Sequence, residues 1–194
     1  MTAAAERGPS VAEGLHADAA RLLAGWPPPD GAQDALRRDY LAHLSAHPDA
    51  MWRSCLPGHL TASAAVLDAS GRRVLLTLHA RLRMWLQLGG HCEAGDLSLL
   101  GAALREAAEE SGIGGLRPLG GPVRLDRHPV PCGGGSFHLD VQFAMVAPEG
   151  AVAVRDARES DDLAWFPVGG LPEGVDGSVR ALVAAAISRF DRGG

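Results

Sequence analysis

Three glutamates with helical spacing, Glu106, Glu109 and Glu110, are the residues best placed for chemistry. At separations of three and four residues they share one side of a helix. Like charges this close repel one another, and the negative C-terminal end of a helix disfavours them further. A bound Mg²⁺ ion, which prefers oxygen ligands, would offset both the repulsion between the glutamates and the unfavourable effect of the helix end. The spacing is therefore compatible with a metal site, and a solvated acidic helix face is the alternative.

The segment that must position these acids has the pattern of one helix. Asp96 belongs to the residue types preferred at a helix N-cap, and Gly112 to those preferred just after a helix end. Between them, apolar side chains recur with helical periodicity. We therefore predict a helix of about four turns between Asp96 and Gly112, whose buried stripe contains Leu100, Ala103, Leu104 and Ala107.

The acids are part of a longer motif. Every fixed position in the second half of the Nudix box (Arg-Glu, apolar, any, Glu-Glu, any, Gly, apolar) is matched by Arg105-Glu106-Ala107-Ala108-Glu109-Glu110-Ser111-Gly112-Ile113. The first half departs from the box. Five residues after Gly90, the box has Glu and this chain has Asp96, and eight residues instead of seven separate Asp96 from Arg105. Over residues 89–113 the chain resembles the Nudix (MutT-like) hydrolases, with its departure confined to the contact at the helix start.

This resemblance implies a Mg²⁺-dependent pyrophosphohydrolase, with Mn²⁺ as the alternative ion. Its substrate would be a nucleoside diphosphate linked to another group: a nucleoside triphosphate, a nucleotide sugar, ADP-ribose or a dinucleotide. By the same resemblance, the metal ligands are Glu106, Glu109 and Glu110, and the backbone at Gly90 comes close to the metal. Arg105 orients the helix acids and, with Glu109, counts among the catalytic residues.

A further acid, Glu159, lies in a polar segment, and similar segments in Nudix enzymes often place an acid over the metals. Glu159 is then a metal ligand or the base that takes a proton from water, and a solvated loop acid is the alternative. Coordination lowers the basicity of a carboxylate, so we expect the base to come from outside the helix. Our order of preference is Glu159, Asp140 and His138.

Three residues are candidate substrate contacts. His138 and Asp140 point to one face of a predicted strand, and His91 lies in the box loop, within reach of a phosphate. An edge strand with a solvated polar face explains His138 and Asp140 equally well. A structural role in the loop is our preferred interpretation of His91.

Two other functions are compatible with the fold. Isopentenyl diphosphate isomerases share it and use a Cys and a Glu near the site, and Cys92 lies in the box loop. A catalytically silent Nudix-like domain that binds or senses a nucleotide is the second alternative. Such domains usually lose a metal acid, whereas this chain retains all three. The intact Arg-Glu and Glu-Glu pairs favour hydrolysis.

Composition narrows the range of partners. The net charge of −5 does not indicate a surface for nucleic acid or anionic membranes. No run of about 18 apolar residues is present to span a bilayer. Three widely spaced cysteines without a Cys-x-x-Cys pair argue against disulfides and structural zinc, so a cytoplasmic location fits best. We expect a small-molecule substrate.

The order of elements predicts the fold class. We expect a helical extension over residues 1–56 and a Nudix domain over 57–194, with a C-terminal helix at about 175–190. The extension is most simply a packing element, with a homodimer surface or a substrate lid as alternatives. The domain is predicted to be an α/β fold, a three-layer α/β/α sandwich around a mixed sheet. Its expected strands are 59–67, 73–79, 84–88, 136–146 and 164–168.

Overall fold

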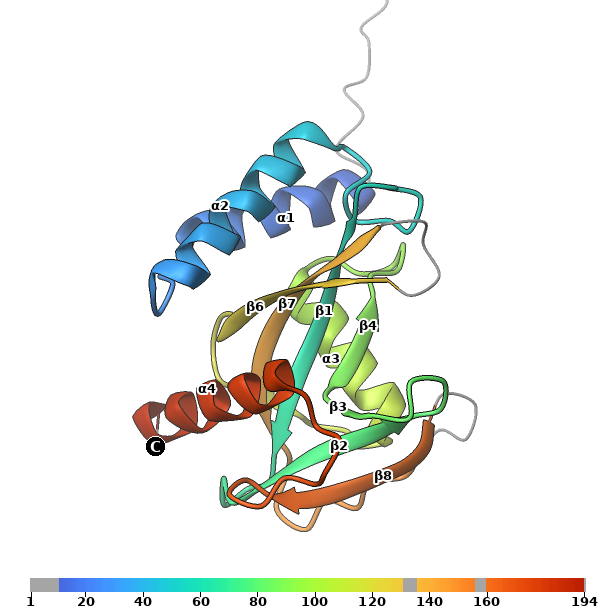
Figure 1. Ribbon diagram of the computed structural model, residues 1–194, viewed down its shortest axis with the longest axis vertical. Coiled ribbons are helices and arrows are strands. Elements are labelled where there is room, and N and C mark those ends of the chain that lie inside the picture. The colour runs from blue at the N-terminus through green and yellow to red at the C-terminus, as the bar shows by residue number, and fades with distance from the viewer. Residues whose placement is uncertain (1–10, 131–135, 156–159, 194) are drawn as a thin grey trace, which may run out of the picture.

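The computed structural model describes residues 11–130, 136–155 and 160–193. Within these ranges the chain forms four helices and one eight-stranded mixed sheet (Figure 1). The helices are α1 (Val11–Gly25), α2 (Gly31–Ala46), α3 (Leu99–Ser111) and α4 (Gly177–Gly193). The strands are β1 (His59–Leu67), β2 (Arg73–His79), β3 (Trp85–Leu86), β4 (Leu88–His91), β5 (Arg117–Pro118), β6 (Arg124–Pro129), β7 (Phe137–Val146) and β8 (Ser160–Pro167).

Two long parallel strands, β1 and β7, form the centre of the sheet. Their register runs from the pair His59 and His138 to the pair Leu67 and Val146. The other edge of β1 pairs antiparallel with β4 near its start and with β2 near its end. β2 continues to β3 and β8, while β7 pairs with β5 and β6. The starts of β1 and β7 and the end of β4 therefore lie side by side.

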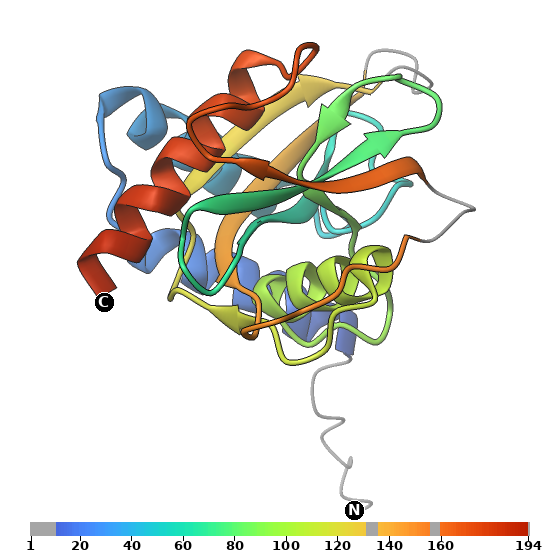
Figure 2. The same cartoon turned by 90° about the horizontal axis from the view of Figure 1, so that it is seen from below.

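Helices cover both faces of the sheet, α3 on one and α4 on the other (Figure 2). Side chains alternate along β1, which is buried along its whole length. Leu60, Ala62, Ala64 and Val66 pack in a core with α3, whereas Ala65 and Leu67 pack in a second core with α4. The predicted three-layer sandwich is confirmed.

The N-terminal helices pack into the α3-side core. Leu15 of α1 and Tyr40 of α2 are fully buried there. The Tyr40 hydroxyl donates to the Asp126 carbonyl at 2.6 Å. The Gln33 amide makes two hydrogen bonds with the backbone of Leu125, at 2.7 and 3.1 Å. These contacts with β6 support the packing interpretation of the extension.

The start of α3 differs from the prediction. Ser98, not Asp96, is the N-cap, and its side chain accepts from the Gly101 N–H at 3.0 Å. Asp96 instead lies in the turn before the helix, where it binds Arg105. The predicted end is correct, because Gly112 adopts the left-handed conformation with φ 65°.

The segment before the helix also differs. The predicted strand at 84–88 is two short strands, β3 and β4, and β4 extends through Gly89 and Gly90 to His91. A glycine pair before a helix is typical of a turn, but Gly89 and Gly90 instead pair with Ser63 and Ala62 of β1. Among the described residues, no helix has both the length and the apolar character needed to cross a membrane.

Candidate active site

The acidic end of α3 lies directly against β4. Gly90 pairs with Ala62 of β1, and a Cβ atom added at Gly90 would lie 2.8 Å from the Glu106 carboxyl carbon. Only glycine leaves the Glu106 carboxylate where it is, so the backbone of the box and its first acid are in contact. Two parts of the motif that are sixteen residues apart thus meet in space.

Arg105 holds this arrangement together with five hydrogen bonds. Its Nε and Nη2 bind Asp96 at 3.1 and 3.0 Å, and Nη2 also binds the His91 carbonyl at 3.0 Å. Its Nη1 donates to Glu106 at 3.0 Å and to Glu109 at 3.1 Å. A guanidinium has five N–H donors, so no Arg105 donor remains for a substrate.

Asp96 is the buried partner of this guanidinium, with 6% of its side chain exposed. Burial alone would raise the pKa of Asp96, but hydrogen bonds from Arg105 and from the Glu93 N–H lower it below its ordinary value. The bonds to Asp96 in turn raise the pKa of Arg105. Both groups therefore stay charged at neutral pH.

The helix acids offer oxygen ligands of differing exposure. The Glu106 side chain is 14% exposed and the Glu109 side chain 61% exposed. Glu110 follows on the same side of the last turn. Carboxylates in such a group fit a hard divalent ion that keeps positions for water and phosphate. Because Gly90 has no side chain, its backbone lies directly beside the Glu106 carboxylate.

A second polar surface lies on the other side of β4 and β1, in continuation of the face that α4 covers. Strand alternation brings polar residues of β1, β4, β6 and β7 to this face, and Gln87 joins them from the residue before β4. We call it the polar sheet face, and it consists of His59, Thr61, Ser63, Gln87, His91, Asp126, His128, His138, Asp140 and Gln142.

Asp140 lies at the centre of the polar sheet face and is 3% exposed. Its carboxylate accepts from Thr61 at 2.9 Å, Ser63 at 2.6 Å and Gln142 at 3.1 Å. Burial raises the pKa of Asp140 in spite of these bonds. β7 is an internal strand, so a solvated edge strand does not account for this residue.

The histidines of this face form a connected chain. His91 Nε2 lies 3.2 Å from His138 Nε2, and His138 Nδ1 lies 3.3 Å from His128 Nε2. His128 Nδ1 in turn contacts Asp126 at 3.0 Å. Burial lowers the pKa of His91 to about 4 and that of His138 to about 3. The hydrogen bond to Asp126 raises the pKa of His128.

The structure places the predicted site residues in two groups on opposite sides of β4, with the helix acids, Arg105 and Gly90 on one side. His138 and Asp140 share one face as expected, and His91 joins them from the end of β4. Sequence reasoning missed His59 and His128. The alternation His59, Thr61, Ser63 in β1 was the available signal for a polar face. Glu159 lies outside the described residues.

At about 100° per residue, a helical wheel predicts that Arg105 points away from Glu106. This prediction is wrong, because the Arg105 guanidinium bonds to both Glu106 and Glu109. The long side chain curls back over the helix surface. Its expected role of orienting the acids stays a prediction that this geometry supports.

Comparison with known proteins gives the family. A NUDIX domain matches residues 57–185. Among curated proteins, no sequence matches this chain. A NUDIX-family hydrolase from Clostridium perfringens is similar in structure, with a TM-score of 0.57 at 21% identity, covering 69% of this chain and 97% of its own.

Two further structures share the fold. The E. coli dihydroneopterin triphosphate pyrophosphohydrolase has a TM-score of 0.53 at 18% identity, covering 68% of this chain and 93% of its own. The NUDIX domain of Shewanella oneidensis NrtR, complexed with ADP ribose, has a TM-score of 0.52 at 19% identity, covering 68% of this chain and 87% of its own. The resemblance of the box and the hydrolase class that it implied are confirmed, and the chain belongs to the NUDIX family.

Proposed function

We propose that the chain is a Mg²⁺-dependent pyrophosphohydrolase of a nucleoside diphosphate derivative. One observation carries this proposal: Arg105 uses all five of its donors within the box and fixes Glu106 and Glu109 beside Gly90. A solvated acidic face needs no such clamp. The clamp offsets the repulsion between acids and holds their oxygens in place for a cation.

In this proposal Glu106, Glu109 and Glu110 hold the ion, with the backbone of Gly90 beside them. When bound, the ion supplies charge neutralisation at the diphosphate and lowers the pKa of a coordinated water. Arg105 keeps the acids oriented and does not touch substrate. Glu159 is our candidate for the base that removes the proton from the attacking water.

The polar sheet face provides the substrate-binding surface in this proposal. It lies on the side of β4 opposite to Gly90 and Glu106. In this proposal the organic groups of the substrate contact His91 and His138 while its diphosphate binds at the acids. Two structural neighbours support the substrate class, since one acts on a pterin triphosphate and one is complexed with ADP ribose. Mn²⁺ is the alternative ion.

The state of Cys92 favours hydrolysis over the isomerase alternative. Cys92 is 7% exposed, and burial raises the pKa of its thiol to about 12. A thiolate is therefore not available at neutral pH, and the side chain faces the core instead of the polar sheet face.

A substrate panel tests the proposal. Nucleoside triphosphates, nucleotide sugars, ADP-ribose and dinucleoside polyphosphates are incubated with the protein and Mg²⁺, and monophosphate or pyrophosphate release is followed. We expect hydrolysis of at least one class and its loss on chelation. Tight nucleotide binding without turnover of any substrate would instead support the silent binding domain.

A further inference from the structure

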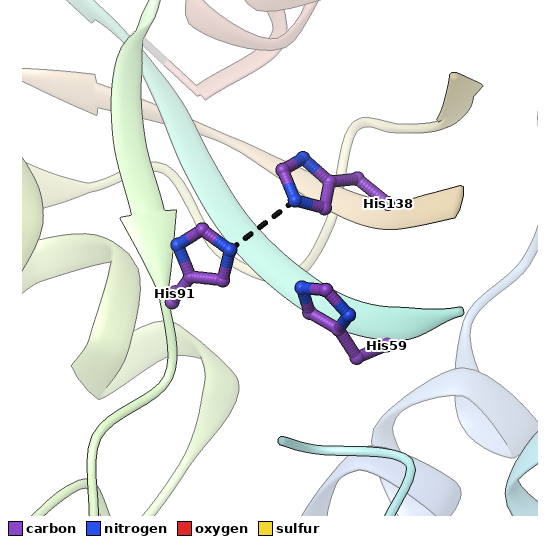
Figure 3. Close-up of side chains that lie close together, drawn as sticks. All are labelled: His59, His91 and His138. Carbon is purple, nitrogen blue, oxygen red and sulfur yellow. Dashed lines mark hydrogen bonds between the residues drawn. The ribbon is translucent and has the colours of Figure 1, made fainter. Parts of the chain in front are cut away.

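We propose that His59, His91 and His138 form a second metal site, selective for a transition-metal ion such as Zn²⁺ over Mg²⁺. The three imidazoles converge from the start of β1, the end of β4 and the start of β7 (Figure 3). The acids of α3 lie on the opposite side of β4. It shares His91 and His138 with the proposed substrate surface, but its test is zinc binding and not turnover, so the two proposals can fail separately.

The distances fit a zinc ion closely. One nitrogen from each ring lies within 4.8 Å of the others, and His91 Nε2 and His138 Nε2 are 3.2 Å apart. Two nitrogens at 2.0–2.1 Å from a tetrahedral zinc are about 3.3 Å apart. The His91–His138 pair already has this separation, and a His59 nitrogen needs to approach by about 1.5 Å at most.

His59 supplies a second, independent observation. It is 4% exposed, and in the described part of the chain neither ring nitrogen has a hydrogen-bond partner. Burying a polar group without a hydrogen-bond partner is unfavourable. Its ring lies 5.1 Å from that of His91 and 4.9 Å from that of His138, between centroids. A metal ion between the rings would satisfy one of these nitrogens.

The second ring nitrogen of His138 is also hydrogen-bonded, as it is in most metal-binding histidines. Its Nδ1 contacts His128 at 3.3 Å, and His128 contacts the Asp126 carboxylate at 3.0 Å. Donation along this chain toward Asp126 places the His138 proton on Nδ1 and leaves Nε2 as the free ligand atom. In zinc sites a carboxylate commonly orients the ligating imidazole, and here Asp126 acts on His138 through His128.

The ligand type decides which ion is selected. Imidazole nitrogen suits zinc, copper and nickel, whereas Mg²⁺ takes oxygen ligands. Three histidines leave a fourth position for water or another ligand, as in catalytic zinc sites. His59 and His138 lie on the central strands β1 and β7, and His91 lies on β4, whose register is fixed by its pairing with β1. The site therefore needs only side-chain rotation to close.

Arg53 opposes metal binding and provides a sharp test. Its Nη2 lies 2.8 Å from His91 Nδ1, and a guanidinium can only donate. This contact places the proton of neutral His91 on Nε2, the atom that the metal needs. Exposed Arg53 must therefore leave before zinc binds, and Arg53→Met should tighten zinc binding roughly 10-fold by removing both the competing bond and a nearby positive charge.

Zinc titration of the tag-free full chain by calorimetry, in saturating Mg²⁺ to occupy the acids, tests the site. We expect about one equivalent to bind wild type, and His59→Ala, His91→Ala and His138→Ala each to weaken that binding at least ~100-fold. His79→Ala, at a turn outside the cluster, is the matched control and should bind as wild type does. Circular dichroism verifies that each variant is folded.

A second measurement uses only wild type. Zinc should shift the ring ¹⁵N signals of His59, His91 and His138 more than those of the other five histidines. Zinc binding that survives all three substitutions would overturn the proposal. So would its loss in Cys55→Ala, which tests the neighbouring group of His47, Asp49 and Cys55. Absence of zinc binding by wild type would overturn it as well.

Discussion

Asp96 and Arg105 form a two-bond ion pair, Nε to Oδ1 at 3.1 Å and Nη2 to Oδ2 at 3.0 Å. Asp96 stands where the Nudix box has Glu, with one additional residue before Arg105. The shorter carboxylate still reaches the guanidinium because it lies in the turn ahead of α3, where the Glu93 N–H also binds it at 2.7 Å. The departure from the box therefore preserves a firm anchor for Arg105.

Arg105→Ala should lower kcat more than it raises KM. All five guanidinium donors are used within the box, so the side chain positions acids and makes no contact that would contribute to substrate affinity. Loss of the partner of buried Asp96 should also destabilise the fold by about 3 kcal/mol. Steady-state kinetics and urea unfolding measure the two effects.

Arg38→Ala is the matched control, because Arg38 makes an exposed pair with Asp34 on α2. Its kinetics and stability should stay near those of wild type. An Arg105→Ala variant that changes KM alone would show that the guanidinium binds substrate.

The two box glycines should respond differently to alanine. A Cβ at Gly90 meets only the side-chain end of Glu106, at 2.8 Å, and no backbone, so Gly90→Ala should keep the fold, displace this carboxylate and weaken apparent Mg²⁺ affinity about 10-fold. A Cβ at Gly89, where φ is 147°, meets the Ser63 backbone at 2.4 Å. Gly89→Ala should therefore destabilise by about 2 kcal/mol or more.

Thermal unfolding and Mg²⁺-dependent turnover separate these two effects. The predicted difference between the two glycines would be contradicted by a Gly90→Ala variant with unaltered Mg²⁺ dependence. It would also be contradicted by a Gly89→Ala variant as stable as wild type.

The sequence predicted the long strands around the site better than the start of the helix that carries the acids. Alternation of apolar and polar residues located β1, β2 and β7 almost to the residue, because each is long and buried on at least one face. The helix start was missed because Asp96 and Ser98 are both good N-cap residues, and the demand of Arg105 for a carboxylate decided between them.

The polar sheet face was predicted only in part, for a topological reason. His59 and His91 are far from His138 in sequence, and the parallel pairing of β1 with β7 brings them together. No local pattern reports that pairing. The helix acids, by contrast, lie about one turn apart, so their spacing alone predicted that they share one side of the helix.

Stability should fall as the pH is lowered from about 6.5 toward 4. His91 and His138 have folded-state pKa values of about 4 and about 3, below the 6.5 of a free histidine, so the unfolded chain takes up protons first. Burial is the main cause, and the neighbouring charges of Arg53 and the histidines add to it. Urea unfolding midpoints across this pH range measure the slope.

Two substitutions should affect this slope differently. His138→Gln removes a depressed group and should make the slope shallower. His128→Gln removes a group whose pKa is raised by the hydrogen bond to Asp126. Its stabilising contribution is fully present below about pH 6.5 and is lost only as the pH rises through the raised value, so this variant should lose stability while its slope between pH 6.5 and 4 stays close to that of wild type. Equal slopes in the two variants would contradict this account.

Glu159→Gln should lower kcat by at least ~100-fold at saturating Mg²⁺ and abolish the acidic limb of the pH–rate profile, if a carboxylate outside the helix is the base. Asp140→Asn is the comparison, because Asp140 is bound by Thr61, Ser63 and Gln142 and lies away from solvent. It should change stability more than the shape of the profile. A Glu159→Gln variant with turnover within a few-fold of wild type would make Asp140 the next residue to test as the base.

The most direct test of the metal-dependent site is the turnover of Glu109→Gln and Glu110→Gln as Mg²⁺ is titrated, with exposed Glu149→Gln as the control. Loss of a metal ligand should reduce kcat at least ~100-fold in each box variant. In metal-free buffer both should unfold at the same or slightly higher temperature, since repulsion between neighbouring acids is relieved. Glu149→Gln should match wild type. Turnover and Mg²⁺ dependence equal to wild type in both box variants would contradict the assignment of the α3 acids as the metal site.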